Sequence, residues 1–277
     1  MKLATFQTKD GKTSWGVVSG AGIVDCGGIA PTMRDGLSKL GAVKDAASRS
    51  PDVQLDAVTL LPPIPTPEKI LCIGLNYMTH IAEGGRPPPE KPIIFVRFPN
   101  SQVGAGQAII APKASDNFDY EAELAVVIGK PCRHVKKADW QSVIAGYSCY
   151  NDGSVRDWQR HSGQFTPGKN FYKSGAFGPY LVTPDEVADI TKSSLVCRVN
   201  GEERQRATIS DLCFDIPTLI EYITTFTELV PGDVIVTGTT GGVGAYFNPP
   251  KWLKPGDTVE VEVSGVGLLK NPVVAEG

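Results

Sequence analysis

The sequence predicts a mostly β protein with a few helices on its outside, an α+β fold. The 277 residues include 30 glycines and 22 prolines, which favour many turns and short strands over helical bundles. Two late segments, LVPGDVIVTGT (229–239) and LKPGDTVEVEV (253–263), each run from a Pro-Gly-Asp turn into strand-like residues. Helices do not alternate regularly with strands, as a doubly wound sheet would require.

The first part of the chain predicts a small unit of its own. Short strands LATFQ (3–7), SWGVVSG (14–20) and GIVDCGG (22–28) are separated by turns at 10–12 and 20–22. A helix-like stretch follows at 36–48, and PPIPTP (62–67) is typical of a stiff linker. We therefore expect a β-rich N-terminal domain over 1–65 and a larger domain over 66–277.

The larger part begins with an apolar strand, KILCIGLNY (69–77), and a short helix over 77–85 that ends at two glycines and a proline run. Strands are predicted around PIIFVRF (92–98) and AELAVVIG (122–129). Helices are predicted over 184–190 and 215–226, the second because Asp215 and Pro217 suit a helix start.

Composition and charge exclude several classes of protein. The net charge of −3 and the absence of a basic cluster give no sign of a nucleic-acid partner. The six cysteines are scattered, without a CxxC pair, which argues against a zinc site or a disulfide framework and fits reduced thiols. No run reaches membrane-spanning length, and the N-terminus is strand-like rather than a signal peptide. We expect a cytoplasmic protein with no membrane partner.

The stretch DYEAELAVVIGK (119–130) places Glu121 and Glu123 on one face of a predicted strand. One interpretation is a solvated strand face. The other is a bound cation, because like charges repel and a buried carboxylate needs a partner. Asp152 follows a second apolar strand and supplies a third carboxylate. Oxygen ligands of this kind suit Mg²⁺, Mn²⁺ or Ca²⁺.

The three histidines are not equivalent. His134 lies among charged residues and is expected to be solvated, while His161, in a polar loop, could be solvated or not. His80 and Glu83 are three residues apart on the predicted short helix, so their side chains are neighbours. Such a pair is either an ordinary surface contact or a base that activates water.

The glycine-rich loop TGTTGGVGAYF (237–247) has no Lys-Ser/Thr after its glycines and no following helix, so it does not match a nucleotide loop. A tight turn, or a close approach of the backbone to some other ligand, is the expectation for it.

Together these segments resemble the fumarylacetoacetate hydrolase family over nearly all of residues 68–277. The resemblance rests on KILCIGLNYMTH with Glu83, DYEAELAVVIGK, NDGSVRDWQ, GK followed by GPYLVT, FDIPTLIEYIT, LVPGDVIVTGTTGGVG and WLKPGDTVEVEV, all in the family's order. It implies a β-roll-like catalytic domain, a homodimer, and a divalent metal beside a small oxo-acid substrate.

The resemblance also implies roles for individual residues. Glu121, Glu123 and Asp152 match the metal ligands, His80 and Glu83 the catalytic pair, and Lys169 a lysine that polarises the substrate. The positions that match polar contacts to substrate, or that lie near the same pocket, are Arg97, Gln159, Thr239, Asn76 and Tyr77.

The reaction implied is hydrolysis of a carbon–carbon bond in a 2,4-dioxo acid, such as an acylpyruvate or a diketo sugar acid. Water activated by His80 and Glu83 attacks the distal carbonyl, and the metal stabilises the departing enolate. An oxaloacetate-type decarboxylase or a hydroxymuconate-type isomerase is the alternative, and a catalytically silent metal- or ligand-binding protein is a third. The chain departs from the family at Tyr172, Gly175, Ala176 and Thr240, which we interpret as a signal of specificity.

Overall fold

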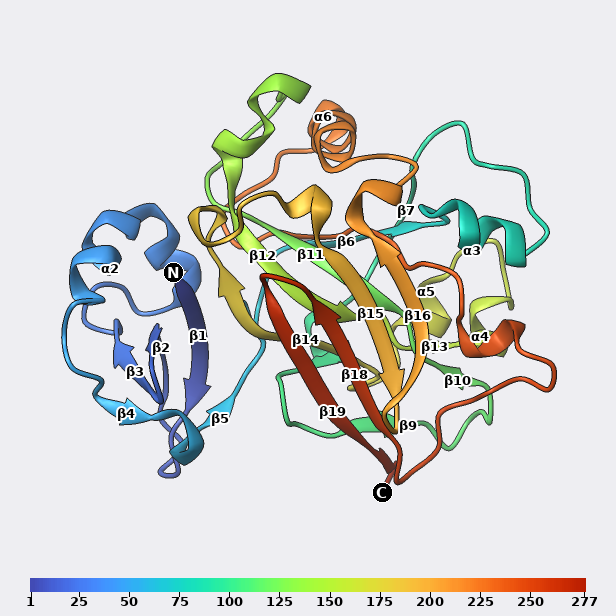
Figure 1. Cartoon of the computed structure of the whole chain (residues 1–277), viewed down its shortest axis with the longest axis horizontal. Coiled ribbons are helices and arrows are strands. Elements are labelled where there is room, and N and C mark those ends of the chain that lie inside the picture. Colours follow the sequence, from blue (N-terminus) through green and yellow to red (C-terminus); the bar gives the residue numbers. More distant parts are fainter.

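Strands account for most of the regular structure, and the predicted α+β class with predominant strands is confirmed. The computed structural model describes residues 1–277. Its strands form a large sheet, a five-stranded sheet and a two-stranded ribbon, with the helices at the periphery (Figure 1).

The large sheet contains twelve strands, ten of them in the order β4-β3-β2-β1-β14-β12-β11-β17-β6-β7, while β5 pairs with β1 and β8 with β14. All pairs are antiparallel except β17 with β6 and β8 with β14. The strands are β1 (Lys2–Gln7), β2 (Thr13–Ser19), β3 (Gly22–Asp25), β4 (Val53–Gln54), β5 (Thr59–Leu60), β6 (Ile70–Gly74), β7 (Ile93–Val96), β8 (Gln102–Val103), β11 (Ala122–Ile128), β12 (Ile144–Asn151), β14 (Gly175–Val182) and β17 (Val234–Val236).

The five-stranded sheet packs on one face of the large sheet. Its order is β16-β15-β18-β19-β9, and one hydrophobic core holds side chains of both sheets, for example Val126 and Val261. These strands are β9 (Ile109–Ala111), β15 (Ser194–Val199), β16 (Glu202–Thr208), β18 (Thr258–Val263) and β19 (Gly267–Ala275), and the ribbon consists of β10 (Phe118–Asp119) and β13 (Ser154–Val155). Alternate side chains of β11 enter this core and a second core on the opposite face, for example Val126 and Val127, and all seven of its residues are buried.

The N-terminal segment is continuous with the large sheet. β1 pairs with β14, with Leu3 opposite Leu181, and the core that contains Leu3 and Trp15 also contains Ala125 and Val127 of β11. In Figure 1 this segment lies at one side of the molecule, with β1 facing the rest of the chain. The division at residue 65 stays a prediction, but the two parts share a sheet and a core.

Six α-helices surround the sheets: α1 (Met33–Gly36), α2 (Leu40–Ala46), α3 (Met78–Glu83), α4 (Arg156–Gln159), α5 (Thr166–Lys169) and α6 (Ile216–Phe226). α6 begins where the sequence predicts, because the Asp215 carboxylate accepts a hydrogen bond from the Thr218 N–H at 2.9 Å and Pro217 lies in its first turn. None of the helices is long and apolar enough to cross a membrane.

The helix predicted over 184–190 is wrong. Only one 3₁₀ turn forms, Pro184–Glu186, and Val187 is already extended. A segment this short has little helical stability of its own. Val187 packs instead on the main core and Ile190 is buried within it, so tertiary contacts decide the backbone conformation here.

Candidate active site

Three carboxylates meet at the end of the two central strands. Glu123 lies in β11, Glu121 directly precedes it, and Asp152 directly follows β12. β11 and β12 pair with Ala122 opposite Asn151, and the Asp152 N–H donates to the Glu121 carbonyl at 2.8 Å. One oxygen from each of the three carboxylates lies within 4.8 Å of the others, and all three residues are buried. The interpretation of a solvated strand face is therefore wrong.

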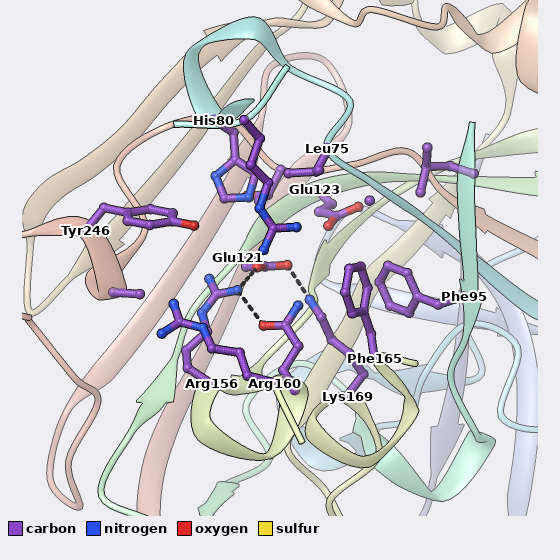
Figure 2. Close-up of a pocket in the computed structure, with 16 residues that line it drawn as sticks. Leu75, His80, Phe95, Glu121, Glu123, Arg156, Arg160, Phe165, Lys169 and Tyr246 are labelled. Carbon is purple, nitrogen blue, oxygen red and sulfur yellow. Dashed lines mark hydrogen bonds and ion pairs between the residues drawn. The ribbon is translucent and has the colours of Figure 1, made fainter. Parts of the chain in front are cut away.

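Two of the three carboxylates are held by buried cations. Lys169 Nζ donates to Glu121 Oε2 at 2.5 Å and to Asp152 Oδ2 at 2.7 Å. Arg156 Nη1 lies 2.6 Å from Glu121 Oε1, and Arg97 Nη1 donates to Asp152 Oδ1 at 2.5 Å. Figure 2 shows Glu121 between Arg156 and Lys169. These contacts partly neutralise the cluster, which a water-excluded site requires.

Glu123 differs because no cationic side chain pairs with it. Its Oε2 accepts only a backbone hydrogen bond, from the Gly238 N–H at 2.5 Å. With Asp119, which pairs with Arg156, the buried cluster holds one more carboxylate than it holds buried cationic partners. The four carboxylates are those of Asp119, Glu121, Glu123 and Asp152, and the three cations are Arg97, Arg156 and Lys169.

The pKa values of the two glutamates move in opposite directions. Burial raises the pKa of Glu121, but the Arg156 and Lys169 cations outweigh it and lower the pKa to about 2. Burial and the neighbouring carboxylates of Asp152 and Glu121 raise the pKa of Glu123 well above its ordinary value. Glu123 thus carries the charge that most needs a further cation.

These observations fit a divalent cation. The donors are carboxylate oxygens only, close together and dry, which is the chemistry that Mg²⁺, Mn²⁺ and Ca²⁺ prefer. A bound divalent cation would change the net charge of the buried cluster from −1 to +1. The loaded site would then attract an anion.

The His80 side chain lines the same cavity as the carboxylate cluster, with Glu83 beside it. His80 Nδ1 is 2.7 Å from Glu83 Oε1, and the His80 side chain is 9% exposed. Glu83 Oε2 accepts from the Gly242 N–H at 2.9 Å, so the carboxylate is held from both sides. The Tyr246 ring meets His80 edge-on, with 6.0 Å between ring centres (Figure 2). Glu121, Glu123 and His80 all line this cavity.

The glycine-rich loop explains how the site is held. Its backbone does approach a partner closely, but the partners are carboxylates of the protein. Four of its N–H groups donate to them: Gly238 to Glu123, Gly242 to Glu83, and Gly244 and Ala245 to Asp119. Amide donors stabilise carboxylates in a site from which water is excluded.

Gly242→Ala should be strongly destabilising. Gly242 has φ +97°, and an added Cβ would lie 2.0 Å from the Arg204 carbonyl oxygen. We expect the free energy of unfolding to fall by more than about 3 kcal/mol, measured by urea denaturation. Gly201→Ala is the matched control, because Gly201 also has a positive φ, +80°, but nothing lies within 4 Å. It should cost only about 1–2 kcal/mol. Equal losses in both variants would contradict the predicted clash.

The residues predicted to contact substrate divide into two groups. Gln159, Thr239 and Lys169 line the cavity. Asn76 and Tyr77 are fully buried and do not. The Asn76 amide is used within the protein, since Nδ2 donates to the Phe214 and Thr237 carbonyls at 3.0 and 2.7 Å. Asn76 therefore ties the segment before α3 to neighbouring backbone, and its side chain is not free to contact substrate.

The prediction of a substrate contact for Arg97 does not fit its surroundings. The side chain is 0% exposed and lies behind Asp152. All five of its N–H donors are used, by the Ser101 hydroxyl and carbonyl, the Asp152 carboxylate, the Gly153 carbonyl and the Ser174 hydroxyl. Arg97 positions a carboxylate and has no donor left for a ligand.

Several residues in and around the cavity were not predicted from sequence motifs. Arg156, Asp119 and the Gly238–Ala245 amides form the support of the carboxylate cluster. Asp119 and Arg156 lie in the segments DYEAELAVVIGK and NDGSVRDWQ. Their opposite charges were the only indication in the sequence that they pair. The other cavity residues that were not predicted include Arg86, Phe95, Arg160, Phe165 and Tyr246.

Comparison with known proteins places this geometry in a family. The family model described as fumarylacetoacetate (FAA) hydrolase, C-terminal, matches residues 69–274. The chain belongs to the fumarylacetoacetate hydrolase family. The predicted resemblance is thus confirmed, and members of this family are enzymes.

Individual relatives carry different activities in their names. The chain is 39% identical over 267 residues to the mitochondrial oxaloacetate tautomerase FAHD2A of Bos taurus, covering 92% of this chain and 85% of the relative. It is 34% identical, with a TM-score of 0.81, to a 5-carboxymethyl-2-hydroxymuconate delta-isomerase from Mycobacterium smegmatis. It is 29% identical, with a TM-score of 0.84, to a maleylpyruvate hydrolase from Sphingobium sp. SYK-6 solved with manganese(II) and pyruvate. Both structures are covered completely, as is this chain.

Proposed function

We propose that the protein is a divalent-metal-dependent hydrolase that cleaves a carbon–carbon bond in a 2,4-dioxo acid. The observation that carries the proposal is His80, which lines the same cavity as Glu121 and Glu123 and whose Nδ1 lies 2.7 Å from the Glu83 carboxylate. A base placed beside a cation site is what activation of water requires. The manganese(II) and pyruvate of the maleylpyruvate hydrolase structure support a metal and an oxo acid here.

Glu121, Glu123 and Asp152 would hold the cation, Mg²⁺ or Mn²⁺, with Ca²⁺ as a further option. When bound, it supplies Lewis-acid stabilisation of negative charge on the oxygens of the 2-oxo acid. Lys169 gives two of its three N–H donors to Glu121 and Asp152, which leaves one for a substrate oxygen. Lys169 also lines the cavity, which supports the role predicted for it.

The proton moves through His80. A carboxylate only accepts hydrogen bonds, so Glu83 fixes the proton of His80 on Nδ1 and leaves Nε2 free as the base. Nε2 takes a proton from water as the hydroxide oxygen bonds to the distal carbonyl carbon. The bond between that carbon and the neighbouring CH₂ then breaks, and its electron pair leaves on the oxo-acid fragment. Protonation of this enolate by the imidazolium yields the 2-oxo acid and a carboxylic acid.

A second candidate is tautomerisation of oxaloacetate. The observation that favours it is the 39% identity to a protein of that name over 92% of the chain, and the similarity to a hydroxymuconate isomerase points the same way. Such a reaction moves a proton without adding water, and His80 could again carry it. Decarboxylation of oxaloacetate is a further alternative that needs no attack by water.

A substrate panel separates these reactions. The Mn²⁺-loaded protein would be given acetylpyruvate, a 2,4-dioxo sugar acid, maleylpyruvate and oxaloacetate, each with and without chelator. Hydrolysis releases two acids, tautomerisation changes the ultraviolet absorbance of the enol without cleavage, and decarboxylation releases CO₂. We expect chelator-sensitive release of two acids from a dioxo acid. Turnover of oxaloacetate alone would replace the proposed hydrolase with one of the other two reactions.

A homodimer and a cytoplasmic location are also proposals. The homodimer is proposed because dimers are common in the family, and sedimentation of the purified protein across a range of concentrations would test it. The second follows from the composition and is checked by fractionation of the source cells.

A further inference from the structure

Two arginines of the cavity have no anionic partner in the protein. Arg86 and Arg160 both line the cavity, both are exposed, and neither guanidinium makes a hydrogen bond or ion pair with another residue. The other two cations of the lining differ: Arg156 pairs with Asp119 and Glu121, and Lys169 with Glu121 and Asp152. Two positive charges at the cavity therefore remain free for a ligand.

These two arginines come from separate segments. Arg86 follows the C-terminal end of α3, the helix that carries His80, and Arg160 directly follows α4. Figure 2 shows Arg156 and Arg160 on one side of the cavity, with Phe95 and Phe165 on the other. A ligand that contacts both free guanidiniums would connect the α3 segment to α4. The cavity thus has a carboxylate cluster for a cation and, apart from it, unpaired cationic groups.

We propose that Arg86 and Arg160 bind the second carboxylate of a dicarboxylic 2-oxo acid. This rests on the proposed function in one respect, that the oxo-acid end of the substrate lies at Glu121, Glu123 and Asp152. A guanidinium presents paired N–H donors that match a carboxylate, and such charge-assisted bonds are stronger than neutral ones. A substrate with an apolar tail would leave both arginines hydrated and gain nothing from them, so the pair acts on specificity.

The test compares two unreactive ligands that differ only in the distal group. 2-Oxoglutarate and 2-oxopentanoate share the oxo-acid end and the chain length, but only the first has a second carboxylate. Binding of each to the Mn²⁺-loaded protein would be measured by titration calorimetry. We expect wild type to prefer 2-oxoglutarate by about tenfold, because the two contacts are partly exposed and each is modest. The preference should shrink as salt is added.

Arg86→Gln and Arg160→Gln should each reduce this preference, and the double variant should abolish it. Binding of 2-oxopentanoate should stay unchanged in all three. Arg133→Gln is the control, an exposed arginine that is not part of the cavity lining. Since Arg86 and Arg160 are exposed and unpaired, their replacement should not alter folding.

The outcomes separate this proposal from the proposed function. A wild type without preference, a protein that binds neither ligand, or a double variant that keeps the full preference would each overturn the arginine site. If the double variant loses the preference while no dioxo acid is hydrolysed, the arginine site stands and the hydrolase proposal fails. If dioxo acids are hydrolysed but wild type shows no preference for 2-oxoglutarate, the hydrolase proposal stands and the arginine site fails.

Discussion

Glu123→Gln should remove tight Mn²⁺ binding, lowering the affinity by more than about 100-fold, and should abolish metal-dependent turnover. Outer-shell changes at metal sites typically cost 10–100-fold, and loss of a charged ligand costs more. Glu123 is the carboxylate without a cationic partner, so its charge contributes most directly to the attraction of a divalent ion. Glutamine keeps the shape and can still accept from the Gly238 N–H. Calorimetric titration with Mn²⁺ measures the effect.

The metal-free form of this variant should be no less stable than wild type. Burial and the carboxylates of Asp152 and Glu121 raise the pKa of Glu123 in the folded protein. A raised pKa means that the folded state loses stability as pH rises from about 4.5, the unfolded value, through the folded pKa. Glutamine removes that loss. Thermal melts at pH 7 with and without Mn²⁺ should therefore show a metal-induced rise in wild type only.

Glu228→Gln is the matched control, since Glu228 is exposed and does not line the cavity. It should bind Mn²⁺ as wild type does. A Glu123→Gln protein that retains wild-type Mn²⁺ affinity would show that the cation is held elsewhere. A variant that melts far below wild type without metal would show that Glu123 is needed for the fold itself.

His80→Ala should lower kcat for hydrolysis of a dioxo acid by roughly 10²- to 10⁴-fold, the range typical of a lost general base. Mn²⁺ affinity should not change, because His80 is not one of the three carboxylate ligands. Glu83→Gln should have a smaller effect in the same direction, because the base remains while its tautomer and orientation are less well fixed. Steady-state rates with Mn²⁺, beside Mn²⁺ titrations, measure both quantities.

His161→Ala is the control for this experiment, since His161 is exposed and does not line the cavity. Unchanged hydrolysis in His80→Ala would remove the His80–Glu83 pair from the mechanism. Oxaloacetate turnover that survives His80→Ala would favour a reaction in which water is not activated, such as decarboxylation.

The carboxylate cluster and the His80–Glu83 contact could be predicted from the sequence, because each depends on local spacing and at most one strand pairing. The alternation of Glu121 and Glu123, together with Asp152 after the next apolar strand, predicts a cluster that the antiparallel pairing of β11 and β12 brings together. The i,i+3 spacing predicts the His80–Glu83 contact in the same way. Both arrangements depend on short-range geometry that any helix or strand imposes.

Contacts between residues that lie far apart in the chain could not be predicted from the sequence. Arg97 was predicted to contact substrate, but Ser101, Asp152, Gly153 and Ser174 take all five of its N–H donors. These contacts depend on which loops pack behind the cluster. Arg86 lies in an ordinary surface sequence, and only the fold shows that it lines the same cavity as Arg156 and Gln159 of α4. The pairing of β1 with β14 could not be predicted, because the sequence of a strand does not indicate which other strand it pairs with.

That pairing has a consequence for how the protein is made. About 170 residues separate β1 from its partner β14, so on a ribosome that adds 5–20 residues per second β1 waits roughly 9–35 s for β14 to appear. During that interval β5 can pair with Phe6 and Gln7 on this edge of β1, but the Lys2–Leu3 end stays open to another chain until β14 appears. Synthesis therefore exposes this end of the nascent chain to aggregation until the sheet closes, and co-expression of chaperones should raise the yield of folded protein.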